Sequence, residues 1–213
     1  MKLLFIGNSH TYYNDMPATV MRLLEQTGTK AHVTMLTKGG KGLIYHAPTH
    51  AVAFNIRYGN YDAVIAQDKA KGFDPVLFRE GASALKQMAD GAGVPLLFYM
   101  PWAGRDHREA QGVMTDTYRD FCKENGCALA PAGEVFTRLL TTEPADALYR
   151  EDGNHATPLG SYAAAVTVFY AVTGRKRVIP VNEKDPGIAL GLSPELCRRI
   201  HADACHAVRL YNG

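Results

Sequence analysis

The sequence predicts an α/β protein, a three-layer α/β/α sandwich around a central parallel five-stranded sheet of the flavodoxin-like kind. Short apolar runs rich in Val, Ile, Leu and Phe alternate with segments whose apolar residues recur every three or four positions, as in parallel strands joined by crossover helices. The 213 residues are 46% hydrophobic and 21% charged, which is enough to enclose one core. No linker, internal repeat or low-complexity tract divides them, so we predict a single domain over residues 1–213.

The five predicted strands are short, as is usual for strands buried on both faces. They cover residues 2–6, 31–36, 63–66, 95–100 and 128–130. Helices are predicted between them where apolar residues have helical spacing. These residues are Val20, Leu23, Leu24 and Thr27, then Phe78, Ala82, Leu85, Met88 and Ala89, then Val113, Thr117 and Phe121.

The remaining elements follow from their capping residues. The boundaries of any helix within residues 43–57 are not predicted, because Pro48 interrupts the helical pattern there. Residues 158–172 are predicted as a helix with Thr157 as N-cap and Gly174 as stop. An irregular stretch continues to residue 191, and a C-terminal helix is predicted at about residues 193–210, with Ser193 as its N-cap.

Composition excludes several classes of function. The chain has 23 Lys+Arg against 21 Asp+Glu and no basic stripe, so we expect no nucleic-acid partner. Its longest apolar runs are far shorter than the roughly 20 residues that span a bilayer, so we expect no membrane partner. The first apolar run ends at Gly7, too early for a signal peptide, and we therefore expect a cytoplasmic protein with four reduced cysteines.

Candidate catalytic groups lie where strands and helices meet. In an open parallel sheet, ligands bind beyond the carboxyl ends of the strands. Ser9 directly follows the first strand, where Gly7 permits a tight exit. Asp152 and His155 precede the helix at residue 158. An imidazole can take the proton of a serine hydroxyl while a carboxylate fixes its tautomer, so these three residues are candidates for a hydrolytic triad.

Together, Gly7-Asn8-Ser9 and Asp152-Gly153-Asn154-His155 resemble the blocks of the SGNH hydrolase family, the GDSL-like esterases. Residues 7–17 are also similar to an uncharacterised bacterial branch of that family. The resemblance covers about residues 2–172 and implies the SGNH hydrolase fold. It also implies that Ser9 is the nucleophile, His155 the general base and Asp152 its orienting partner.

The same resemblance implies an oxyanion hole. In the family, the N–H of a glycine after the second strand joins that of the serine, and Gly40 is favoured here, with Gly39 as the competing register. The family's G-x-N-D block should follow the third strand, yet no Asn is present there. The amide of Gln67 is the expected replacement, and Lys69 is the alternative.

The turn after the fourth strand holds the only tryptophan. Trp102 is expected at the rim of the pocket, where an aromatic face can stack on a sugar or cover an acyl group. Tyr12 and Tyr13 are expected to form the opposite wall. The other expected substrate-binding residues are Asn8, His10 and Gly39.

We expect neither a metal nor another cofactor. Cys197, His201 and Cys205 have helical spacing, but eight residues of helix span about 12 Å, too far for both thiolates to ligate one zinc. His46 and His50 are separated by Pro48, which makes a helical pair of ligands unfavourable.

The leading hypothesis is a metal-independent serine esterase that removes short acyl groups, acetyl in particular, from a small-molecule or glycan ester. The absence of a long apolar lid and the aromatic residues near the predicted site favour this substrate class. A thioesterase or lysophospholipase of the same family, with a preference for longer acyl chains, is the alternative enzyme. The missing Asn leaves a third hypothesis, a catalytically weak binding domain on the same scaffold.

Overall fold

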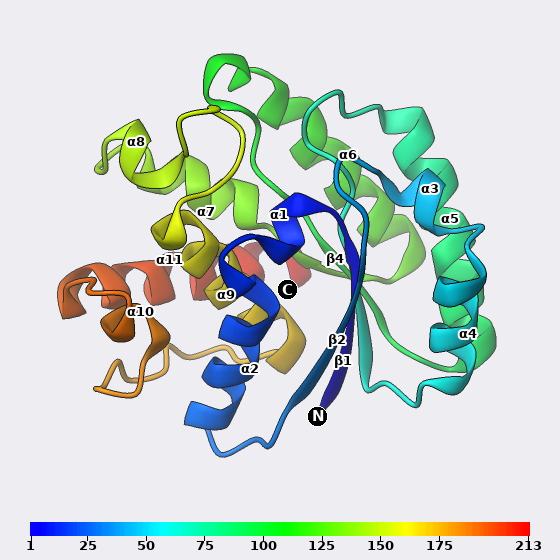
Figure 1. The fold of residues 1–213 in the computed structure, drawn as a ribbon, viewed down its shortest axis with the longest axis horizontal. Helices are drawn as coiled ribbons and strands as arrows, with labels where there is room; N and C mark the ends of the chain where they lie inside the picture. The colour runs from blue at the N-terminus through cyan, green and yellow to red at the C-terminus, as the bar shows by residue number, and fades with distance from the viewer.

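The computed structural model describes all 213 residues and has one parallel sheet between two layers of helices (Figure 1). The strands are β1 (Lys2–Gly7), β2 (His32–Thr37), β3 (Ala63–Ala66), β4 (Leu96–Tyr99) and β5 (Ala128–Ala130). Their order across the sheet is β2-β1-β3-β4-β5, and every neighbouring pair is parallel. The predicted α/β/α fold class and its five strands are therefore confirmed.

The helices divide between the two faces of the sheet, as the nearly edge-on sheet in Figure 1 shows. One face carries α2 (Met16–Gln26), α7 (Ala132–Leu139), α9 (Pro158–Thr173) and α11 (Pro194–Asn212). The other face carries α3 (Leu43–His46), α4 (His50–Tyr58), α5 (Pro75–Ala92) and α6 (Ala110–Asn125). The short helices are α1 (Ser9–Tyr12), η1 (Tyr13–Asp15), η2 (Arg105–His107), α8 (Ala145–Leu148) and α10 (Pro186–Ala189).

Each face of the sheet has its own hydrophobic core. Along β1, Leu3 and Phe5 pack with the α2, α7, α9 and α11 side, whereas Leu4 and Ile6 pack with the α3 to α6 side. Successive side chains of a strand point to opposite faces. Burial on both faces explains why the inner strands β3 and β4 are continuously apolar, whereas the edge strand β2 is only partly buried and contains polar residues.

Helix α9 is buried over nearly its whole length, between the sheet and α11. Thr157 caps it by accepting the N–H of Gly160, and Gly174 ends it with a left-handed φ of 61°. A helix that is apolar on all sides belongs in a core. Its capped start fixes the position of the residues just before it, which include His155.

Four stretches are more helical than the sequence indicates. Residues 43–57, left open above, form α3 and α4, with Pro48 in the gap between them. The irregular stretch before residue 191 contains α10, and α7 and α8 were not predicted. The last helix continues to Asn212, two residues beyond the predicted end.

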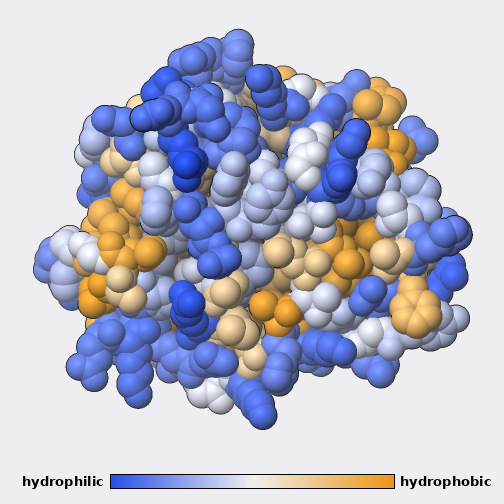
Figure 2. Space-filling view, viewed as in Figure 1, coloured by the Kyte–Doolittle hydropathy of each residue, from blue (hydrophilic) through white to orange (hydrophobic).

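The loops that leave β1, β2 and β3 meet at one edge of the sheet, where α1 begins (Figure 1). β1 lies between β2 and β3, so its exit is the point where the strand order reverses. The same view of the surface is largely hydrophilic, with separate hydrophobic patches (Figure 2). None of the helices combines the length and the hydrophobicity needed to cross a bilayer.

Candidate active site

Ser9 is the first residue of α1, two residues after β1 ends. Asn8 is the N-cap, and its Oδ1 accepts the N–H of His10 at 3.0 Å. A Cβ at position 7 would overlap Thr11 Oγ1 and Gln67 Oε1, so only glycine fits where the strand turns into the helix. The tight exit places the Ser9 hydroxyl at the surface of the loop cluster and holds its backbone in one conformation.

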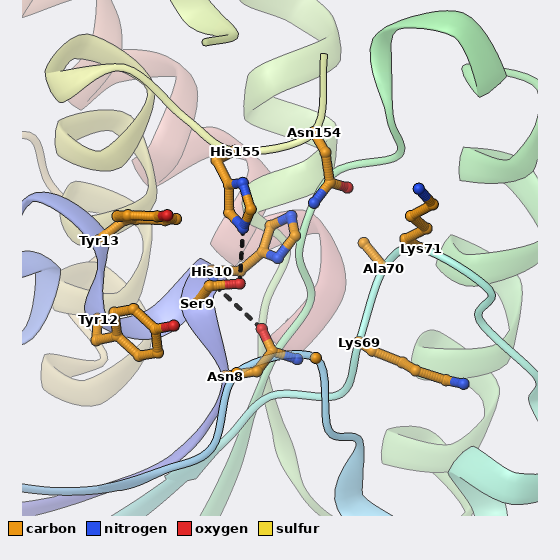
Figure 3. A pocket seen from close by; sticks show the side chains of 12 residues that line it. Asn8, Ser9, His10, Tyr12, Tyr13, Lys69, Ala70, Lys71, Asn154 and His155 are labelled. Carbon is orange, nitrogen blue, oxygen red and sulfur yellow. Dashed lines mark hydrogen bonds between the residues drawn. The ribbon is translucent and has the colours of Figure 1, made fainter. Parts of the chain in front are cut away.

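Ser9, His155 and Asp152 form a hydrogen-bonded chain (Figure 3). Ser9 Oγ lies 2.8 Å from His155 Nε2, and His155 Nδ1 lies 2.5 Å from Asp152 Oδ2. An ionised carboxylate can only accept, so His155 Nδ1 carries the proton and Nε2 presents its lone pair to the Ser9 hydroxyl. This is the geometry in which an imidazole can deprotonate a serine.

The carboxylate of Asp152 is held by the turn that it closes. Its Oδ1 accepts the N–H groups of Asn154 and His155, both at 2.9 Å. Partial burial acts to raise the pKa of Asp152, but the hydrogen bonds from the His155 ring and from these two N–H groups outweigh it and hold that pKa below its usual range. Asp152 therefore stays ionised and fixes both the orientation and the tautomer of His155.

Two aromatic rings flank the imidazole of His155. The ring of Tyr13 meets it edge-on with centroids 4.4 Å apart, and the ring of His10 lies 5.6 Å away. Burial of the His10 side chain lowers its pKa to about 4, so this second imidazole is neutral near pH 7. His10 Nε2 is buried without a hydrogen-bond partner.

Trp102 lies beneath the site, not at the rim where the sequence places it. It is 2% exposed, and its ring stacks on Phe136 with centroids 4.5 Å apart. Its Nε1–H donates to Asn154 O at 3.0 Å. The largest aromatic surface of the loop cluster is thus buried, and it supports the segment that carries His155.

The expectation that Gln67 supplies an oxyanion donor is wrong. Gln67 is fully buried, and its Oε1 accepts the N–H of Asn8 at 3.1 Å and the hydroxyl of Thr11 at 2.7 Å. Its Nε2 donates to the backbone oxygen of Asp68. The amide is occupied by the buried polar groups of the nucleophile turn, which would otherwise have no partners. Gln67 is a positioning residue for that turn.

The glycine loop after β2 borders the site opposite His155. Gly39 and Gly40 both line the pocket, and Gly40 has a φ of +70°, a left-handed conformation that favours glycine. The N–H groups of Ser9, Gly39 and Gly40 donate no hydrogen bond within the protein. Asn8 Nδ2 donates to Lys41 O at 2.9 Å, which ties this loop to the nucleophile turn.

A buried carboxylate supports the glycine loop from below. Asp68 Oδ1 accepts the N–H of Leu43 at 3.1 Å, where α3 has no capping side chain of its own. Burial raises the pKa of Asp68, whereas its hydrogen bonds from the N–H groups of Lys69 and Leu43 lower it less strongly. Gln67 and Asp68 thus both hold the backbone around the site in place by accepting hydrogen bonds from its N–H groups.

The pocket in front of Ser9 has a volume of about 370 Å³. Figure 3 shows Tyr12 and Tyr13 on one side of Ser9, and Asn154 with the Lys69–Lys71 segment on the other. The lining residues are Asn8, Ser9, His10, Tyr12, Tyr13, Gly39, Gly40, Lys69, Ala70, Lys71, Asn154 and His155. Lys69 is at this wall and has no hydrogen bond to the Ser9 turn.

The sequence analysis missed three residues of this pocket and one that holds it together. Ala70, Lys71 and Asn154 were not singled out, although the position of Asn154 beside His155 was a usable signal. Asn14 Nδ2 donates to Ala156 O at 3.0 Å and to Ser161 Oγ at 2.8 Å, joining the loop after Ser9 to the segment after His155. No local pattern reveals such a contact, because it joins residues more than 140 positions apart.

The residues weighed as metal ligands have other surroundings. Cys197, His201 and Cys205 lie on the buried face of α11, where His201 hydrogen-bonds to Asp185 and Tyr170. His46 is buried in α3, whereas His50 is exposed at the start of α4.

No family model and no curated protein matches the sequence. Solved structures do match the fold. A candidate SGNH hydrolase from Slackia heliotrinireducens is 25% identical, with a TM-score of 0.70 over 80% of this chain and 98% of that one. A DUF4886 family protein from Bacteroides uniformis is 17% identical, with a TM-score of 0.79 over 100% of this chain and 96% of that one. An acetyl xylan esterase variant from Geobacillus stearothermophilus is 16% identical, with a TM-score of 0.58 over 80% and 94%.

The parallel sheet defines an α/β protein, and the Slackia protein that matches it is described as an SGNH hydrolase. The resemblance indicated by the two sequence blocks is confirmed: the chain is SGNH hydrolase-like. The match to the Slackia protein supports hydrolase activity.

Proposed function

We propose that this protein is a serine esterase that needs no metal and hydrolyses short-chain acyl esters, acetyl esters in particular. The single observation that carries the proposal is the chain of hydrogen bonds from Asp152 through His155 to Ser9, with the Ser9 hydroxyl facing a pocket. Ser9 is the proposed nucleophile, His155 the general base and Asp152 the residue that orients it.

The reaction proceeds in two halves. His155 Nε2 takes the proton of Ser9 Oγ as Oγ attacks the ester carbonyl carbon, and the same nitrogen then protonates the departing alcohol oxygen. Water, deprotonated by His155, next attacks the acyl-serine, and the acid is released as His155 returns the proton to Ser9 Oγ. Asp152 stabilises the imidazolium that forms in both halves, because its carboxylate already bonds Nδ1.

The negative charge that develops on the carbonyl oxygen is stabilised by backbone donors. We assign this role to the N–H groups of Ser9 and Gly40, both of which are free of partners within the protein. Preorganised donors of this kind contribute roughly 3 kcal/mol each in serine hydrolases. With Gln67 otherwise engaged, the proposed hole has two donors, both from the backbone.

The size and polarity of the pocket favour a small acyl group. Its walls are made of polar side chains, glycines and the rings of Tyr12 and Tyr13, with Ala70 as a small apolar contact. An apolar chain of eight carbons gains little from such walls, since transfer free energy follows the apolar area that is buried. This supports a short-chain esterase over a lysophospholipase.

The test is hydrolysis of p-nitrophenyl acetate, butyrate and octanoate by the wild type, Ser9→Ala and a matched control, Ser83→Ala, all with a chelator present. Ser83 lies exposed on α5, away from the pocket. We expect chelator-insensitive turnover, fastest on acetate, that falls at least ~10³-fold in Ser9→Ala and is unchanged in Ser83→Ala. Removal of such a nucleophile costs about 10⁶-fold elsewhere.

Two outcomes contradict parts of the proposal. A preference for octanoate moves the function to a long-chain thioesterase or lysophospholipase. Absence of Ser9-dependent turnover on every ester, with no labelling of Ser9 by a fluorophosphonate, removes the esterase altogether and favours a binding domain.

A further inference from the structure

Resting on that proposed function, we propose that the alcohol released from the substrate carries an anionic group, a carboxylate or a phosphate, which Lys69 and Lys71 bind. The substrate class is then an acyl ester of a hydroxy acid or of a phosphorylated alcohol. The pocket alone indicates only a short acyl group. The lysines in the wall opposite Tyr12 and Tyr13 indicate that the alcohol half of the ester is anionic.

The wall opposite the two tyrosines carries two lysines that form no salt bridge. Lys69 is half-buried and Lys71 is exposed, and both line the pocket, yet neither forms a salt bridge. By contrast, Lys86 on α5 is paired with Asp90. Two pocket-lining ammonium groups that form no salt bridge suit an anionic ligand.

No carboxylate in the catalytic pocket competes for these cations. The lining residues include neither Asp nor Glu. Asp152 is hydrogen-bonded to His155, and Asp68, the acidic neighbour of Lys69, is turned beneath the loop to accept the N–H groups of Leu43 and Lys69. The charge that faces the substrate is therefore positive.

The lysine wall leads into a second cavity. This cavity has a volume of about 510 Å³ and shares Ala70, Lys71 and Asn154 with the catalytic pocket. Three carboxylates line this second cavity. Asp106 lies 3.6 Å from Arg105, Asp152 is hydrogen-bonded to His155, and Glu109 lies 3.6 Å from the His107 ring. Lys71 lies at the junction of the two cavities, and Lys69 lies on the side of the catalytic pocket.

The lysines lie on the side of Ser9 where the leaving alcohol departs, so the anionic group belongs to the alcohol and not to the acyl group. Asn154 immediately precedes His155, the group that protonates the departing oxygen, and Figure 3 shows Asn154 and Lys71 on the same side of Ser9. Lys69 and Lys71 extend from their loop away from Ser9, so their ammonium groups meet the distal part of a leaving alcohol. Tyr12 and Tyr13, on the far side, are left for the acyl group.

The experiment compares acetate release from two matched pairs of esters by the wild type and by Lys69→Gln/Lys71→Gln. One pair is O-acetylglycolate and O-acetylglycolamide, and the other is 1-acetylglycerol 3-phosphate and 1-acetylglycerol. Lys123→Gln, at an exposed lysine on α6 without a salt bridge, is the control. Ser9→Ala gives the background for each ester.

We expect the wild type and Lys123→Gln to favour an anionic ester about five- to tenfold in kcat/KM, and the double variant to hydrolyse the two esters of each pair with equal kcat/KM. The preference should shrink as ionic strength rises. The pair that shows it identifies carboxylate or phosphate. Equal rates within both pairs, or a preference that survives in the double variant, overturn the inference while Ser9-dependent turnover of neutral esters leaves the esterase intact. No Ser9-dependent turnover of any ester overturns both.

Discussion

The molecule contains two hydrogen-bond chains, each made of a carboxylate, an imidazole and a hydroxyl, and the two have different roles. In the pocket, Asp152, His155 and Ser9 are joined at 2.5 and 2.8 Å. Between α9, α10 and α11, Asp185 Oδ2 lies 2.9 Å from His201 Nε2, and His201 Nδ1 lies 3.1 Å from Tyr170 Oη. The order of groups is the same, but the side chains of Asp185 and His201 are fully buried.

The hydroxyl makes the difference between the two chains. The ionised carboxylate of Asp185 can only accept, so in the neutral imidazole of His201 the proton is on Nε2, which donates to Asp185 Oδ2. His201 Nδ1 then accepts from the Tyr170 hydroxyl, whose oxygen accepts the N–H of Ile179 at 3.0 Å. Asp185 also accepts from Tyr162. Every donor and acceptor in this set has a partner, and burial raises the pKa of Tyr170 to about 12.

Ser9, by contrast, opens on a pocket beside backbone N–H groups that have no partner. A carboxylate–imidazole pair thus indicates catalysis only when its hydroxyl is accessible and faces free oxyanion donors. The buried chain instead ties the segment around α10 to α9 and α11. Variants of each chain should accordingly change different observables.

The largest expected effect comes from Asp152→Asn, set against Asp185→Asn. An amide at position 152 donates to His155 Nδ1 and so favours the wrong tautomer, and we expect kcat to fall about 10⁴-fold with little change in stability. Asp185→Asn should leave kcat per active site within about twofold. Steady-state kinetics with active-site titration checks both, and normal turnover in Asp152→Asn would remove that residue from the mechanism.

His201→Ala should lower the free energy of unfolding by about 3–5 kcal/mol, because it leaves the carboxylate of Asp185 buried without its imidazole partner. His201→Gln, which retains a donor, should lose less and serves where the alanine variant does not fold. Urea unfolding measures both. A stability equal to that of the wild type in both variants contradicts the structural role assigned to the buried chain.

His10, the third imidazole, should make stability depend on pH. In the folded protein the pKa of His10 is about 4, below the reference value of 6.5 that applies to the unfolded chain. As the pH falls, the unfolded state therefore binds a proton first. The free energy of unfolding has its full value above about pH 6.5 and decreases towards pH 4. At pH 4.5 the loss relative to pH 7 is about 2.5 kcal/mol.

Urea unfolding at pH 7 and pH 4.5 isolates this contribution when His10→Phe is compared with the wild type. His107→Phe is the control, since the His107 side chain is 78% exposed. We expect the free energy of unfolding to fall less between pH 7 and pH 4.5 in His10→Phe than in the wild type and in His107→Phe. Equal losses in all three proteins would show that His10 titrates alike in the folded and unfolded chains.

The smallest effect is expected from Tyr162→Phe. It removes one donor to Asp185 at 2.7 Å, and we expect a loss of about 1 kcal/mol in stability with kcat unchanged. Tyr45→Phe, at an exposed tyrosine, should change neither quantity. A large drop in kcat for Tyr162→Phe would mean that the two chains are coupled.

The sequence predicts what is encoded locally. The strands follow from apolar runs, and Ser9 and His155 could be singled out because each lies within a few residues of a strand or helix end. Parallel strands bring their exits to one edge, so segments 146 residues apart could be expected to meet.

Burial and amide orientation depend on distant partners, and there the sequence analysis fails. Trp102 is buried because the ring of Phe136 covers it and because its Nε1–H donates to Asn154 O. Both partners are remote from Trp102 in the sequence. Gln67 turns its oxygen to Asn8 because that N–H needs an acceptor. The pairing of Asp185 with His201 likewise joins two elements that no spacing rule connects.

The position of Trp102 has an optical consequence. It is the only tryptophan of the chain, its indole N–H bonds the backbone of Asn154, and its ring lies 4.9 Å from that of His10. Its emission therefore comes from a single, fixed place beneath the reacting groups. Any event that displaces the Asn154–His155 segment changes the surroundings of that one fluorophore, so its emission reports such a displacement in unlabelled protein.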